Sequence, residues 1–159
     1  YILSFADMLM KPIMNRITKN RWNYTDKELS KAKEFGLLDA LSLKAMGYWI
    51  VADPICSSHC SGCHNEGRPL YFNAMGMLIR HKCPSSICIH GLSQLSPIIY
   101  NYYDYLLQGK DPNDMVFKHA TCTDIGLEAG GLGNNFFRVT YEKMPIMEFL
   151  NGRMGVGPS

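Results

Sequence analysis

The strongest constraint on the fold is a segment with three cysteines and two histidines within nine residues, in a stretch bounded by Pro54 and Pro69. The residues on either side, 41–51 and 70–83, have the apolar content and alternation typical of strands. The cysteine-rich segment is therefore predicted to lie in a hairpin loop over 52–69. Because connections of this length usually carry a function, this loop is the first candidate site.

A haem-attachment motif lies inside this loop. Cys60 begins the sequence Cys-Ser-Gly-Cys-His, which is the spacing at which two thiols attach a c-type haem and the next histidine ligates its iron. Cys60 and Cys63 would form the thioethers, with His64 as axial ligand. His90 and Met77 are candidates for the second axial position. The motif predicts electron transfer through haem c, in a subunit of a larger redox assembly or in a homo-oligomer.

The same segment is compatible with two other metal groups. Cys56, Cys60 and Cys63 have the spacing Cys-x3-Cys-x2-Cys, which suits three irons of a four-iron four-sulfur cluster. A zinc site made from these thiols and either His59 or His64 is the third interpretation. The sequence leaves haem, cluster and zinc open.

Composition limits the partners and the location. A formal charge of +2 is too small to imply binding to nucleic acid. No run approaches the roughly 18 apolar residues that a membrane span needs. The six cysteines fit a periplasmic or extracellular location if two hold haem and the others form disulfides. They fit a cytoplasmic location if a reduced set serves a cluster.

Two helices are predicted ahead of the first strand. Residues 3–20 carry apolar side chains at spacings that suit one face of a helix. Thr25 and Glu28 form a capping-box signature, so a second helix is predicted over 27–35.

The second half of the chain predicts one helix and two more strands. A serine before Pro97 marks the start of a helix over 98–108. Residues 115–122 and 136–141 have strand patterns and are joined by a glycine-rich turn over 130–135.

These patterns predict a single α+β domain over 1–150. It contains N-terminal helices, a small antiparallel sheet of about four strands, and helices packed on one face of the sheet. The cysteine-rich hairpin belongs to this domain as its metal- or haem-binding loop. Residues 151–159 contain three glycines and a proline and predict a flexible tail.

A set of elements between about 78 and 141 resembles a known enzyme family. In order, they are a strand ending on Cys83, Leu-Ser-Pro at 95–97, Asp104, Asp-Pro at 111–112, Gly-Gly at 130–131 and Phe-Phe-Arg at 136–138. In order and spacing this set resembles the L-2-amino-thiazoline-4-carboxylic acid hydrolase family. The resemblance implies a nucleophilic thiol at Cys83 with Asp104 as its polar partner. A thiolate is a reasonable nucleophile for opening a cyclic amidine.

The chain departs from this family pattern in two ways. The segment from Tyr100 to Tyr103 and the pair Asn134 and Asn135 stand where the family tends to place cysteines, and the cysteine-rich hairpin is an addition. These departures favour a redox use of the scaffold over hydrolysis. Whether the chain is an enzyme stays open.

Overall fold

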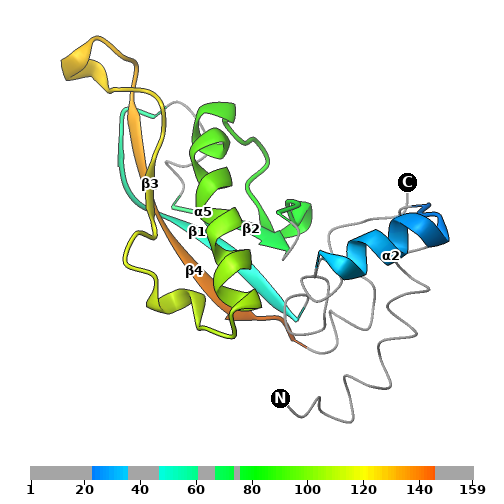
Figure 1. Ribbon diagram of the computed structural model, residues 1–159. Coiled ribbons are helices and arrows are strands. Elements are labelled where there is room, and N and C mark those ends of the chain that lie inside the picture. Colours follow the sequence, from blue (N-terminus) through cyan, green and yellow to red (C-terminus); the bar gives the residue numbers. More distant parts are fainter. Residues whose placement is uncertain (1–22, 36–46, 61–66, 74–75, 146–159) are drawn as a thin grey trace. The chain divides into compact units, whose positions relative to one another are not determined.

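The computed structural model describes residues 23–35, 47–60, 67–73 and 76–145 (Figure 1). The chain divides into two compact units, 1–46 and 47–159, which are described separately. The predicted helix within 3–20, the first residues of the predicted strand over 41–51, and the predicted tail over 151–159 lie outside the described residues. The single domain over 1–150 stays a prediction.

The first unit contains helix α2, Asp26–Glu34. Its N-terminus is the predicted capping box: the Glu28 backbone N–H donates to Thr25 Oγ1 at 3.3 Å, and the Thr25 backbone N–H donates to the Glu28 carboxylate at 2.8 Å. The Thr25 hydroxyl, which donates to the Glu28 carboxylate at 2.7 Å, and then the Thr25 backbone N–H lower the pKa of Glu28. The predicted helix over 27–35 is confirmed within one residue at each end.

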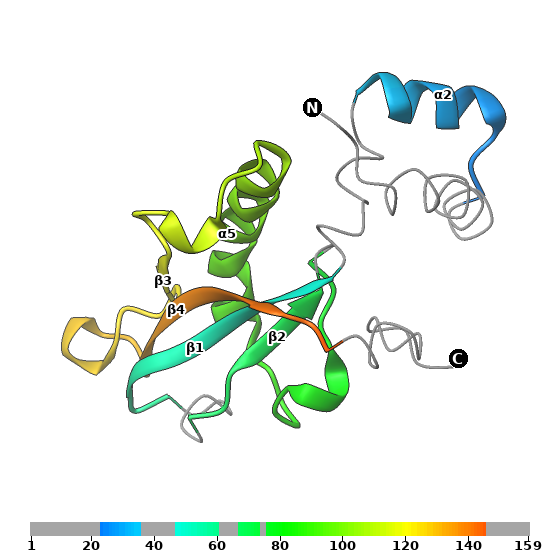
Figure 2. The same cartoon turned by 90° about the horizontal axis from the view of Figure 1, so that it is seen from below.

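The second unit is built on a four-stranded antiparallel sheet in the order β2-β1-β4-β3 (Figures 1 and 2). The strands are β1 (Tyr48–Ser58), β2 (Leu70–Asn73), β3 (His119–Thr121) and β4 (Asn134–Lys143). Each corresponds to one of the four predicted strands, so the predicted α+β fold with a small antiparallel sheet is confirmed. The central pair, β1 and β4, is much longer than the two edge strands.

Helix α5, Ile89–Leu107, packs across one face of the sheet (Figure 2). Alternate residues of β4 point toward it, and Phe137 and Val139 are fully buried there. Tyr102 of α5 is also fully buried, and its hydroxyl donates to the Val139 carbonyl at 2.8 Å. The main core comprises Ile50, Ala52, Leu70, Phe72, Leu95, Ile98, Ile99, Tyr102, Met115, Ala120, Phe137 and Val139.

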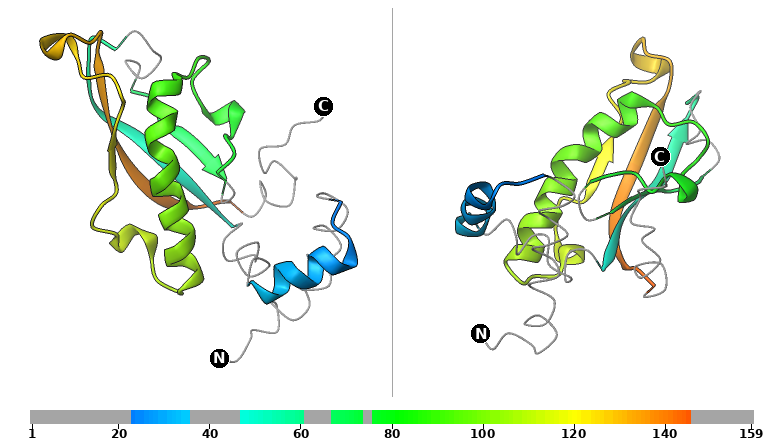
Figure 3. Two further views of the ribbon diagram at one scale, coloured as in Figure 1. Left: turned by 45° about the horizontal axis from the view of Figure 1, so that its top comes forward. Right: turned by 90° about the vertical axis from the view of Figure 1, so that its right-hand side faces the viewer.

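The face of the sheet that α5 does not cover can be followed in Figure 3. It carries a smaller apolar cluster. Trp49, Val51, Ile79 and Met144 are buried there. The 3-10 helix η2, Arg80–Lys82, lies beside this cluster, and the Lys82 ammonium is 4.0 Å from the centre of the Trp49 ring. Toward the other end of β4 this face is exposed.

The prediction of a loop over the whole of 52–69 is wrong for its first part. Strand β1 continues to Ser58 and pairs with β4 as far as Asn134. Pro54 lies within the strand, where a register shift between Pro54 and Cys56 marks an irregularity. Proline is tolerated at such a bulge because the bulge already interrupts the ladder of backbone hydrogen bonds, so the missing N–H of proline costs little. Cys56 is therefore a strand residue, opposite Phe136.

Two other predicted boundaries are corrected. Strand β2 ends at Asn73, and the predicted strand end at Cys83 is replaced by the 3-10 helix Arg80–Lys82. Helix α5 begins at Ile89, so Pro97 lies inside the helix, on its exposed side. The buried face of α5 stabilises the helix enough to outweigh the hydrogen bond that proline removes.

Replacement of Tyr102 by Phe tests the coupling of α5 to the sheet. The variant leaves the buried Val139 carbonyl without its donor, so the free energy of unfolding should fall by about 1–2 kcal/mol. Urea denaturation measures the loss. Tyr100 is 72% exposed, so Tyr100→Phe is the matched control and should leave the stability unchanged. Equal stabilities for the two variants would contradict this role of Tyr102.

Candidate metal centre

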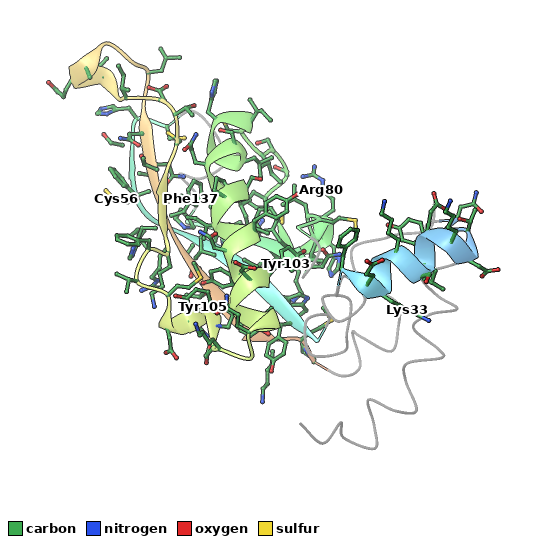
Figure 4. All side chains as sticks on the ribbon, viewed as in Figure 1. Lys33, Cys56, Arg80, Tyr103, Tyr105 and Phe137 are labelled. Carbon is green, nitrogen blue, oxygen red and sulfur yellow. The ribbon has the colours of Figure 1, made fainter. Side chains whose placement is uncertain are left out.

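Four of the described cysteines lie at one end of the sheet, which we call the cysteine end. This end is formed where β1 finishes and β4 starts, with Ser58 opposite Asn134 (Figure 4). The loop after β3 and the first turn of α5 join it through a backbone hydrogen bond from Thr123 to His90. The cysteine end carries the side chains of Cys56, His59, Cys60, Cys88, His90 and Cys122.

Gly133 brings the cysteine-rich segment against the start of β4. A Cβ built on Gly133 would collide with the carbonyl group of His59 and would lie 2.7 Å from the Cys60 backbone nitrogen. Only glycine leaves room for this approach of the two backbones. His59 has a φ of 52°, and its Nδ1 is 2.9 Å from Ser58 Oγ. The sequence pattern identified these glycines as turn residues, and this one also positions Cys60.

Asp124 organises the loop between β3 and β4. Its Oδ1 accepts hydrogen bonds from the backbone N–H groups of Gly126 and Leu132, both at 3.0 Å. The backbone N–H of Gly126 is the main reason that the pKa of Asp124 is lowered. Gly126 and Gly130 have positive φ values on either side of the 3-10 helix η4, Leu127–Ala129. The glycine-rich turn between the last two strands is therefore confirmed, although Asn134 and Asn135 belong to β4.

His90 is held at the cysteine end by Thr123. The His90 Nδ1 and the Thr123 Oγ1 are 3.0 Å apart, and the Thr123 backbone N–H donates to the His90 carbonyl at 3.4 Å. Met77 lies elsewhere, because its carbonyl accepts a hydrogen bond from Asn73, which pairs with Trp49 near the start of β1. At about 3.3 Å per strand residue, the start of β1 is roughly 30 Å from its cysteine end.

Cys122 and Asn135 lie side by side on the last two strands. The Cys122 backbone N–H donates to the Asn135 carbonyl at 2.9 Å. The Cys122 sulfur is 3.6 Å from both the Asp124 carbonyl oxygen and Asn134 Oδ1. Asn135 is fully buried. Asn135 was not selected as a site residue from the sequence. It is a polar residue on the same face of the strand as the apolar Phe137 and Val139, and this pattern could have identified it.

Not all the predicted ligands are described. Cys63 and His64 lie outside the described residues. Within the parts of the chain that the structure covers, no three His, Cys, Asp or Glu side chains form a complete metal-binding group. Cys56, Cys83, Cys88 and Cys122 are free thiols.

The described hydrogen bonds of Cys83, the nucleophile of the hydrolase interpretation, are with Tyr71 and not with its expected partner Asp104. The Cys83 sulfur accepts a hydrogen bond from the Tyr71 backbone N–H at 3.3 Å and donates to the Tyr71 carbonyl at 3.5 Å. Burial raises the pKa of the Cys83 thiol, although the Tyr71 N–H and Arg80 act in the opposite direction. Asp104 is exposed on α5. A nucleophilic thiol usually has a lowered pKa, so the surroundings of Cys83 do not activate it.

The raised pKa of Cys83 predicts slow alkylation at neutral pH. Only the thiolate reacts with iodoacetamide, and burial keeps the Cys83 thiol protonated. Cys83 should therefore react more slowly than the exposed Cys56 at pH 7, and its rate should rise only as the pH is increased further than an unburied thiol requires. Mass spectrometry of peptides from timed reactions measures both rates. Faster labelling of Cys83 at pH 7 would contradict the effect of burial.

Replacement of Gly133 by Ala tests the close approach at the cysteine end. The new methyl group would push the backbone of His59 and Cys60 away, which should lower the free energy of unfolding by about 1–3 kcal/mol. Leu132 is 79% exposed in the same loop, so Leu132→Ala is the control and should change stability by less than about 0.5 kcal/mol. Chemical denaturation measures both variants, and a wild-type stability for Gly133→Ala would rule out the contact.

Comparisons with known proteins identified no relative of this chain. No protein-family model, curated protein or solved structure matches the chain. No helix among the described residues is long and apolar enough to cross a membrane. The resemblance of residues 78–141 to the thiazoline-carboxylate hydrolase family stays a prediction.

Proposed function

We propose that this chain is a redox metalloprotein that transfers electrons through an iron centre at its cysteine end. The observation that carries the proposal is that thiols from three separate parts of the sequence lie at the same end of the sheet. Cys60 follows β1, Cys88 precedes α5 and Cys122 follows β3, yet all three lie at one end of the sheet. Thiolates are soft ligands that select iron–sulfur clusters, zinc and copper(I).

An iron–sulfur cluster is the form of this centre that we favour. Cys56, Cys60 and Cys63 have suitable spacing for three ligands, and a cluster needs a fourth. Cys122 is the strongest candidate. Its sulfur contacts Asn134, and the residue before Asn134 is Gly133, which packs against the backbone of Cys60. A cluster of this kind belongs in a reducing, cytoplasmic environment.

A c-type haem is the second form, and the position of His90 favours it. Cys60 and Cys63 would attach the haem and His64 would ligate its iron. His90 lies at the same end of the sheet, and its contact through Nδ1 to Thr123 leaves Nε2 as the ligating atom. Met77, near the start of β1, is the weaker candidate for the second axial ligand. Covalent haem would imply a periplasmic or extracellular location.

The surface around the cysteine end suits a partner. Cys56 and His59 are exposed, and large apolar side chains are exposed nearby at Ile89, Ile125 and Leu132. Exposed apolar residues beside a redox centre are typical of a surface where another protein docks. The partner is a redox protein or a second copy of this chain.

The hydrolase interpretation receives less support than either metal. The described contacts of Cys83 join it to Tyr71, and burial raises its pKa. Turnover of a thiazoline-carboxylate that is lost in Cys83→Ser and kept in Cys60→Ser would revive this alternative. Zinc is the third metal candidate, with the same thiols and His59 or His64 as ligands.

The absorption spectrum of natively purified protein tests the proposal. A cluster gives a broad brown absorption that bleaches on reduction, with no added covalent mass. Haem c gives sharp bands on reduction and a mass increase of one haem. Cys60→Ser should abolish either signal, while Cys83→Ser is the control and should keep it. A colourless protein without bound iron would reject the redox proposal and leave zinc and the Cys83 hydrolase to be tested.

A further inference from the structure

The two edges of the sheet differ in how their backbone groups are used. At the β2 edge, the Tyr71 carbonyl accepts a hydrogen bond from the Ile79 backbone N–H at 2.8 Å. The Cys83 thiol contacts both the N–H and the carbonyl of Tyr71. The part of β1 that extends beyond β2 contains Pro54 and a register shift, and both features hinder pairing with another strand. This side of the sheet is therefore closed or interrupted.

Strand β3 forms the opposite edge of the sheet (Figure 1). The carbonyl of Lys118 and the N–H of Cys122 bond to the backbone of β4, at 2.8 and 2.9 Å. In an antiparallel pair, residues bonded in this way alternate with residues whose N–H and C=O groups point away from the partner strand. The backbone groups of His119 and Thr121 therefore point away from β4. In the part of the chain that the structure describes, no strand pairs with them.

The β3 edge lacks the features that usually prevent pairing between sheets. Phe117, His119 and Thr121 occupy the alternate positions of this edge, and none of them is an Asp, Glu, Lys or Arg. His119 and Thr121 are exposed, and Phe117 is 86% exposed. The pairing of β3 with β4 has no register shift. Natural edge strands are commonly protected by a charge, a proline or a bulge, so this edge is suited to pairing with another strand.

We infer that two copies of this chain associate through their β3 edges, as an antiparallel pair with a two-fold axis at His119. The described strands offer one suitable edge, so the same edge is used by both copies and the contact closes at a dimer. The two four-stranded sheets then form one continuous sheet. This inference goes beyond the proposed function and requires no metal.

An axis at His119 gives each outward-pointing residue of the edge a partner. The two His119 residues lie opposite each other, and Phe117 lies opposite the partner's Thr121. Thr121 pairs with Phe136 of its own subunit, which is 43% exposed, and opposed residues share a face of the sheet. The rings of Phe136 and the partner's Phe117 therefore lie on either side of Thr121 and can pack against its methyl group.

Charged groups near the edge do not oppose this dimer. Arg138 pairs with His119 on the neighbouring strand, and its guanidinium is 3.9 Å from the Asp53 carboxylate. In the dimer the two Arg138 residues are three strand spacings apart, about 14 Å, which exceeds the Debye length of about 8 Å at physiological salt. The Lys118 ammonium donates to the Asn113 carbonyl of its own subunit at 2.6 Å. Repulsion across the axis is therefore screened.

Sedimentation equilibrium of the full-length protein tests the dimer. The wild-type mass should approach twice the 18.0 kDa of one chain as the concentration rises. Phe117→Lys should weaken association at least about tenfold, because it places on each subunit the charge that protects natural edges. Tyr100→Lys is the matched control, since it adds the same charge at a 72% exposed aromatic residue of α5 and should leave association unchanged.

Cross-linking tests the register. In an antiparallel pair, the Cα atoms of hydrogen-bonded residues are about 5.5 Å apart, which suits a disulfide. His119→Cys treated with oxidised glutathione should therefore form a disulfide between the two substituted positions. Phe117→Cys is the control and should not link to its own copy, because the two positions are about 13 Å apart along the strands. Peptide mass spectrometry separates these links from those of the native cysteines.

Two results would overturn the inference. One is a monomer at every concentration up to about 1 mM. The other is a dimer that persists in Phe117→Lys and does not cross-link through His119→Cys, because such a dimer uses another surface. Both results are independent of the absorption spectrum, so the redox proposal and the dimer can fail separately.

Discussion

The pairing of β1 with β4 is the interaction on which the rest of the second unit depends. These two strands pair from Tyr48 to Ser58, whereas β2 pairs over four residues and β3 over three. The long ladder holds the inward side chains of β4 against α5. Its strands also contribute side chains to the apolar clusters on both faces of the sheet. Because β1 continues past Pro54, it also carries the cysteine-rich segment to the place where β4 begins.

The buried core and the candidate metal ligands lie at different ends of the β1–β4 pair. The half near Ile50 and Val139 is fully buried under α5 and supplies the stability of the fold. The other half has the exposed Cys56, exposed imidazoles, a loop held by Asp124, and the fully buried Asn135. A rigid core next to a polar, partly exposed end is a common arrangement for a binding site, since the core fixes the strands that position the ligands.

Local patterns in the sequence were sufficient for much of the fold but not for the site. The capping box at Thr25 and the alternation along β4 depend on neighbouring residues, so both were predictable. Pro54 and Pro97 were taken as boundaries, yet strand pairing and helix burial place them inside elements. The position of Cys60 against the start of β4 depends on strand pairing and on the missing side chain of Gly133, and the spacing of residues in the sequence reveals neither. The ligand set therefore could not be chosen from the sequence.

The unequal lengths of the strands have a consequence for motion. Among the residues that the structure describes, β1 has no partner on its β2 side beyond Ala52. Its last residues and the start of β4 therefore extend from the core as a narrow ribbon edged by the short strand β3. Few buried apolar contacts hold this ribbon, so it can open at a smaller free energy than the strands under α5. Any ligand that bridges Cys60 and Cys122 would tie its two edges together and slow amide hydrogen exchange there, while exchange in the core stays unchanged.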